Sequence, residues 1–99
     1  MSCIIATLRA KPGQAAALER VLREQVAKTD REEGTLVYEL VRPVDEADTL
    51  LVYERYRDET AKAAHLATPY LAEAFKAVAP LVAEPVSLRY LTLLARIER

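Results

Sequence analysis

The chain has few of the residue types from which most metal and cofactor sites are built. Its 99 residues include one cysteine, one histidine, two glycines and no tryptophan. Two glycines cannot form a glycine-rich loop of the kind that cradles phosphate groups. One histidine and one cysteine are too few for the common His/Cys metal sites, and no nucleophile-elbow pattern is present. The sequence therefore predicts no metal and no resident cofactor.

An excess of charge of one sign is also missing, since 14 basic residues balance 15 acidic ones. Nucleic-acid and anionic membrane surfaces usually require clustered positive charge. The N-terminal apolar run, residues 3–8, is too short for a signal sequence or a membrane span. Cys3 has no partner for an internal disulfide, which suits a reducing compartment. We expect a cytoplasmic protein that binds neither nucleic acid nor membrane.

The remaining composition is that of one globular domain spanning residues 1–99, with 52% hydrophobic and 29% charged residues. Hydrophobic spacing and turn residues predict the element order β-α-β-β-α(α)-β. Asp58 and Pro69 are suited to begin helices, and Gly34 is suited to end one. The strands are expected at 3–10, 35–42, 49–57 and 86–97, and the helices at 14–33, 59–67 and 68–79.

This element order indicates an α+β fold of the ferredoxin-like, split-βαβ type. Such a fold has a four-stranded antiparallel sheet with its helices on one face. The predicted third strand is apolar on both faces, with Leu50 and Val52 opposite Leu51 and Tyr53. Because helices cover only one of these faces, we expect a homodimer that covers the other.

Two titratable residues are candidates for catalysis. His65 is the only histidine, and histidine is a common general base near neutral pH. Glu54 lies in an otherwise apolar row of the predicted third strand, where a carboxylate must be either solvated or paired. Pairing with His65 would orient the imidazole. The alternatives are a surface or core-edge histidine and an exposed strand glutamate.

Aromatic side chains gather in the central part of the chain. Tyrosines can stack on a flat ligand and donate hydrogen bonds to its oxygens. They are therefore candidates for substrate binding, although ordinary packing in the core or the dimer would explain each one singly. The candidates are Tyr38, Tyr53, Tyr56, Tyr70 and Phe75.

Several segments together carry a resemblance to a known family. They are Lys11-Pro12-Gly13, Glu33-Gly34, Tyr38-Glu39-Leu40, Val52-Tyr53-Glu54-Arg55-Tyr56, His65-Leu66-Ala67-Thr68-Pro69 and Phe75. In order and spacing they resemble the antibiotic biosynthesis monooxygenases, especially the small quinol-monooxygenase-like members, over nearly the whole chain. The resemblance implies a dimeric α+β barrel with a pocket between sheet and helices. It also implies cofactor-independent oxidation of a quinol- or anthrone-type aromatic by dioxygen.

The resemblance assigns the family's strand glutamate to Glu54, its helix histidine to His65 and its second-strand tyrosine to Tyr38. This chain departs from the family at Tyr56, where tryptophan is frequent, and at Glu33, where proline is frequent. The haem-degrading relatives use an Asn, His and Trp set. Because the chain contains no asparagine or tryptophan, that activity is not expected.

Three hypotheses for function follow. In a monooxygenase, His65 would be the base or proton shuttle, Glu54 would orient it, and the tyrosines would position the ring. In an isomerase of a small carbonyl compound, the same pair would move a proton without oxygen. A phosphorylated substrate of that isomerase would need a basic cluster, for which Arg42, Arg55 and Arg89 are candidates. The third hypothesis is a ligand-binding dimer without catalysis.

Overall fold

The computed structural model describes residues 1–99 and confirms the predicted order of elements. A short 3-10 helix, Ala79–Leu81, follows the last α-helix. No helix combines the length and the apolar character that crossing a bilayer requires. The elements are β1 (Ser2–Arg9), α1 (Ala15–Thr29), β2 (Thr35–Val41), β3 (Thr49–Tyr56), α2 (Glu59–Leu66), α3 (Pro69–Val78) and β4 (Ser87–Thr92).

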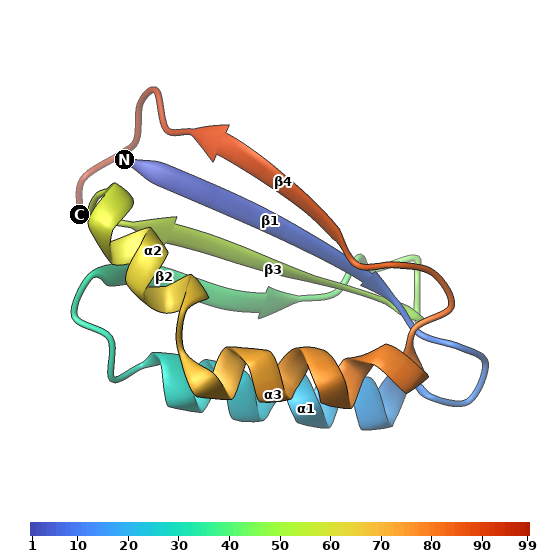
Figure 1. Ribbon diagram of the computed structural model, residues 1–99. Coiled ribbons are helices and arrows are strands. Elements are labelled where there is room, and N and C mark those ends of the chain that lie inside the picture. The colour runs from blue at the N-terminus through green and yellow to red at the C-terminus, as the bar shows by residue number, and fades with distance from the viewer.

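The four strands form one antiparallel sheet in the order β2-β3-β1-β4. Helices α1 and α3 run side by side across one face of the sheet, and α2 lies over one end of it (Figure 1). This arrangement is the ferredoxin-like α+β fold. The register places Glu54 of β3 between Tyr38 of β2 and Ile4 of β1, on the face that the helices cover.

The hydrophobic core fills the space between the sheet and helices α1 and α3. Each fully buried aliphatic side chain contributes about 1.5–3 kcal/mol to folding. On α1 the buried stripe begins with Leu18 and Leu22 and continues as the polar residues Gln25 and Thr29. The stripe becomes polar toward the C-terminal end of α1. The main core residues are Ala6, Leu8, Ala10, Leu18, Leu22, Leu50, Val52 and Val78.

The opposite face of the sheet has no covering element within the chain (Figure 1). Residues paired across strands share a face, so Cys3, Ile5, Tyr53 and Arg55 lie together there. The Arg55 Nε atom is buried and has no hydrogen-bond partner. We call this surface the far face. Its covering by a second copy of the chain stays a prediction.

Local sequence chemistry explains where α2 and α3 begin. The Asp58 side chain accepts a hydrogen bond of 2.8 Å from the backbone N–H of Ala61, which confirms it as the N-cap of α2. Pro69 occupies the first turn of α3, where its missing N–H costs nothing. Both predictions are confirmed.

The ends of two predicted elements, the last strand and the first helix, are wrong. The last strand ends at Thr92 instead of residue 97, because its neighbour β1 begins at Ser2 and the pairing stops after the Leu93 N–H donates to the Met1 carbonyl at 3.1 Å. Helix α1 ends at Thr29 instead of residue 33. Gly34 does not have the left-handed conformation of a helix-ending glycine, since only Gly13 has a positive φ.

Gly34 is required for a different reason, which is a close approach to α2. A Cβ atom built on Gly34 would lie 2.4 Å from the Cβ of Ala61. Overlap of this size forces the backbones apart. The glycine therefore allows the loop that follows α1 to pack directly against α2.

The first prediction concerns this contact. Gly34→Ala should lower the free energy of unfolding by about 1–3 kcal/mol, because the added methyl group overlaps Ala61. Urea denaturation measures the change. Adding Ala61→Gly should recover part of the loss, although glycine in a helix costs about 0.5–1 kcal/mol of its own. Unchanged stability in Gly34→Ala would contradict the packing described.

Candidate functional site

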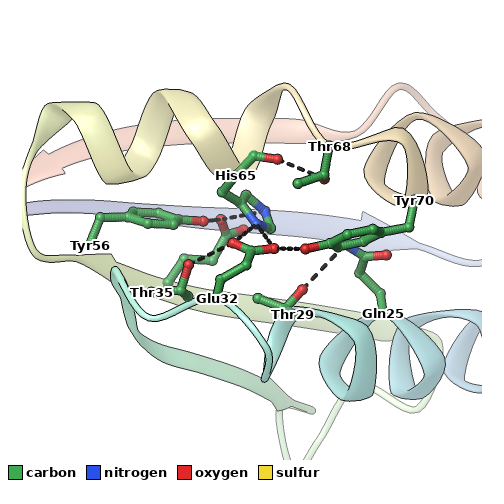
Figure 2. A network of polar contacts seen from close by, with 9 residues as sticks. Gln25, Thr29, Glu32, Thr35, Tyr56, His65, Thr68 and Tyr70 are labelled. Atoms are coloured by element: carbon green, nitrogen blue, oxygen red, sulfur yellow. Dashed lines mark hydrogen bonds and ion pairs between the residues drawn. The ribbon is translucent and has the colours of Figure 1, made fainter.

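A buried histidine lies at the centre of the polar network shown in Figure 2. His65 is on the inner face of α2 and is 1% exposed. Its ring lies beside those of Tyr38 and Tyr56, with centroid distances of 5.3 and 5.4 Å. A buried imidazole must satisfy both ring nitrogens. The residues facing those two nitrogens therefore determine what the ring can do.

Glu32, from the loop between α1 and β2, faces Nδ1 of His65 at 2.9 and 3.1 Å through its two carboxylate oxygens. Thr35 donates to the same carboxylate at 2.8 Å, and Tyr70 of α3 donates to it as well. Burial alone would raise the pKa of Glu32. The hydrogen bonds from Tyr70, Thr35 and His65 outweigh that effect and lower the pKa. Glu32 is thus ionised at neutral pH.

Glu54, on the central strand β3, faces the other ring nitrogen. Its Oε1 lies 3.9 Å from His65 Nε2 and accepts a hydrogen bond of 2.5 Å from the Tyr56 hydroxyl. Only 5% of Glu54 is exposed. Burial raises the pKa of Glu54 to about 7, the hydrogen bond from Tyr56 opposes this, and the charge of Glu32 adds to it. Glu54 can therefore both hold and release a proton near neutral pH.

An apolar cavity of about 50 Å³ lies between the sheet and the helices, with Glu54 in its wall. Gln25 and Tyr38 are the other polar side chains lining it. Burial, followed by the charge of Glu54, raises the pKa of Tyr38, so its hydroxyl stays neutral. The apolar lining residues are Ala6, Leu8, Leu22, Val52, Leu71, Ala74, Phe75, Val78, Val86 and Leu88.

The structure separates the predicted site residues into three groups. Glu54, Tyr38 and Phe75 line the cavity, whereas His65 and Tyr56 do not line it and contact Glu54 instead. These five residues come from four elements, the strands β2 and β3 and the helices α2 and α3.

Three of the predicted substrate-binding residues, Tyr53, Tyr56 and Tyr70, do not line the cavity. Tyr53 is on the far face, where its hydroxyl lies 3.6 Å from the Cys3 thiol. Strand alternation puts it opposite Glu54. Tyr70 contacts Glu32 on the outer side of the network. Neither Tyr53 nor Tyr70 is among the residues that line the cavity.

The structure does not bring the three candidate arginines together. Arg42 pairs with Glu19 at 2.6 Å, at the edge of β2. Arg55 and Arg89 align with far-face residues of β1. No basic side chain lines the cavity, so nothing there would bind a phosphate group. Nor does any group of three or more His, Cys, Asp or Glu side chains lie close enough to hold a metal ion.

Glu32 is the site residue that the sequence analysis misses. The imidazole was expected to pair with Glu54, but the carboxylate at hydrogen-bonding distance belongs to Glu32. Glu32 precedes His65 by 33 positions and lies in an irregular loop. Neither helical nor strand periodicity reports on a loop side chain. The one available signal is its place beside Glu33-Gly34, in a segment that carries the family resemblance.

The comparisons with known proteins concern the family and the fold. The sequence model of a family described as antibiotic biosynthesis monooxygenase matches residues 1–77. None of the curated proteins matches the chain. Three solved structures are similar over nearly their full length. The structure of Rv0793 from Mycobacterium tuberculosis is 27% identical with a TM-score of 0.91, and 98% of each chain is covered.

The other two are more similar in sequence. A protein of Caulobacter crescentus CB15, named as a candidate antibiotic biosynthesis monooxygenase, is 33% identical with a TM-score of 0.88, covering 95% of this chain and 90% of its own. PA3566 from Pseudomonas aeruginosa is also 33% identical, with a TM-score of 0.86 and coverage of 95% and 94%.

The second prediction follows from the raised pKa of Glu54. The ordinary value is 4.5 and the folded value is about 7, so the folded state binds this proton more tightly. The resulting stabilisation is complete below the unfolded pKa and is lost as the pH rises through the folded one. As the pH rises from about 5 to about 8, deprotonation of Glu54 should lower the free energy of unfolding by about 2–3 kcal/mol.

Glu54→Gln should remove this pH dependence, because the amide does not titrate. Urea denaturation of both proteins at the two pH values gives the comparison. Glu24→Gln, an exposed change on α1, serves as the control and should keep the wild-type dependence. Parallel curves for wild type and Glu54→Gln would show that Glu54 has an ordinary pKa.

Proposed function

The chain belongs to the antibiotic biosynthesis monooxygenase family, and on this basis we propose that it is a cofactor-independent monooxygenase. Its proposed substrate is a quinol- or anthrone-type aromatic, which it oxidises with dioxygen. One observation carries the proposal. A carboxyl group with a pKa of about 7, Glu54, lies in the wall of a mainly apolar cavity.

The chemistry requires little more than a base and a dry cavity. Dioxygen reacts slowly with closed-shell molecules, but an enolate or phenolate can transfer an electron to it. For an anthrone-type substrate, the CH₂ group becomes C=O, one oxygen atom enters the product, and the other leaves as water with the two hydrogens. The protein would supply deprotonation and exclude bulk water.

Glu54 is the group placed to accept the substrate proton, because it lines the cavity and His65 does not. This assignment exchanges the roles given to the two residues in the sequence analysis. His65 Nε2, at 3.9 Å, then serves as the proton shuttle behind Glu54. Catalytic hydrogen bonds are frequently longer in the absence of ligand. Tyr38 and Phe75 would hold the aromatic ring.

Substrate entry requires the cavity to widen. Its volume of about 50 Å³ is smaller than the ~150 Å³ that accommodates a benzene ring in a protein core. Four lining residues belong to α3, namely Leu71, Ala74, Phe75 and Val78. Phe75 is 41% exposed and so is not locked in the core. We expect α3 to move outward when substrate binds.

The homodimer is part of the proposal. Far-face residues such as Ile5, Leu51 and Leu91 form an apolar surface that nothing in the chain covers. A second copy packed against this surface would cover it.

The third prediction tests the proposed activity. Oxygen uptake by metal-stripped protein is measured over a panel of quinols and anthrones, with uncatalysed autoxidation subtracted. Glu54→Gln should lower the rate by about 10²–10⁴-fold, because it removes the general base. His65→Ala should also lower it. Glu24→Gln should leave the rate unchanged.

The outcomes separate the hypotheses. Uptake above background that depends on Glu54 would support the monooxygenase. Turnover of a carbonyl compound without oxygen consumption would indicate an isomerase instead. Ligand binding without turnover across the panel would indicate a binding protein, and in either case the proposed oxygenase function would be wrong.

The fourth prediction concerns assembly. Light scattering should give about twice the mass of one chain, since two-fold dimers are the commonest oligomers. Leu51→Arg, on the far face, should shift the mass toward that of one chain because it places a second charge against the partner. Val44→Arg is the control, because Val44 is fully exposed in the loop between β2 and β3, and it should leave the mass unchanged. A single-chain mass for wild type at every concentration would refute the dimer.

A further inference from the structure

The two sides of the His65 ring differ in charge. An ionised carboxylate has no hydrogen to donate, so the nitrogen that faces Glu32 must carry one. Both Glu32 oxygens lie within 3.1 Å of Nδ1. Thr35 and Tyr70 donate to the same carboxylate from β2 and α3 and hold it in place. The geometry at Nδ1 therefore comes from three elements of the fold.

The other groups facing the imidazole do not compete for Nδ1. Glu54 lies on the Nε2 side, at 3.9 Å, and its Oε1 already accepts a hydrogen bond from Tyr56. The Tyr38 and Tyr56 rings pack against the imidazole at centroid distances of 5.3 and 5.4 Å. Burial raises the pKa of both tyrosines, so they stay neutral. Glu32 is thus the one charged group at hydrogen-bonding distance from the ring.

We propose that Glu32 is a positioning residue that fixes His65 as the tautomer with its hydrogen on Nδ1. The Nε2 lone pair then faces Glu54. Once Glu54 has taken a proton from substrate, its O–H bond breaks and an N–H bond forms on Nε2. The product is a carboxylate and an imidazolium, and the Glu32 carboxylate balances the new positive charge. The kinetic part of this inference rests on the proposed function, whereas the tautomer does not.

The chain offers a direct test, because His65 is its only histidine and gives one pair of imidazole ¹⁵N signals. In the wild-type protein above neutral pH, Nδ1 should show the shift of a protonated ring nitrogen and Nε2 that of a bare one. In Glu32→Gln the two shifts should move toward each other, because an amide can either donate or accept. Glu33→Gln removes the adjacent exposed carboxylate and should leave both shifts unchanged.

The wild-type spectrum alone can overturn the inference. A hydrogen on Nε2, or an equal mixture of tautomers, would show that Glu32 does not set the tautomer, and this result needs no folded variant. Two fixed shifts that persist in Glu32→Gln would equally show that the carboxylate is not responsible.

Kinetics of an oxidised substrate provide the second measurement. Glu32→Gln should lower kcat on the order of 10²-fold or more with little change in KM, since Glu32 does not touch the ligand. In this variant the acidic limb of the pH–rate profile should move to lower pH. The charge of Glu32 raises the pKa of Glu54, and the glutamine removes that charge. Glu32→Asp, which keeps a carboxylate, should recover part of kcat. A rise in KM with an unchanged kcat would show that Glu32 has only a structural role.

A protein that shows the Nδ1 tautomer but oxidises no substrate would refute the oxygenase function and leave the role of Glu32 intact. A protein that oxidises substrate while His65 carries its hydrogen on Nε2 would refute the role of Glu32 and leave the oxygenase function intact. The two proposals therefore fail in distinguishable ways.

Discussion

One buried imidazole held between two carboxyl groups of unequal charge connects the parts of this fold. Glu32 comes from the loop after α1, His65 from α2 and Glu54 from the central strand β3. Glu32 stays ionised while Glu54 titrates near neutral pH, because only Glu32 receives several donated hydrogen bonds. Ionising both carboxyl groups in this buried space costs free energy, and this cost holds the pKa of Glu54 at about 7. The network therefore sets the position of the α1–β2 loop against the helices.

The sequence was sufficient to predict features that depend on residues close together along the chain. Asp58 and Pro69 begin helices through contacts within one turn, so their roles were predictable. Glu54 could be placed on the same strand face as Leu50 and Val52 because strand side chains alternate. The end of β4 could not be predicted, since it depends on where β1 begins. The contact of Glu32 with His65 joins positions 33 apart and depends on the path of a loop.

Gly34 shows how a correct residue can be given the wrong reason. Glycine after a helix usually indicates a left-handed end, but here its missing side chain allows the loop to lie against Ala61. Sequence patterns report backbone preference more readily than the proximity of a distant helix. That close contact keeps the loop carrying Glu32 next to α2. Tyr53 shows a related limit, because alternation puts it opposite Glu54 but only the structure shows which of the two faces the helices cover.

The two halves of the cavity differ in how freely they can change. Glu54 belongs to a strand bonded to a neighbour on each side, so its backbone cannot shift without disrupting the sheet. The opposing wall is α3, whose lining residues are simple apolar side chains. Substitutions there would reshape the space for a ligand while the proton-carrying groups stayed in register. In proteins built this way, substitutions in one helix can therefore change which ligand is preferred while the acid–base groups stay the same.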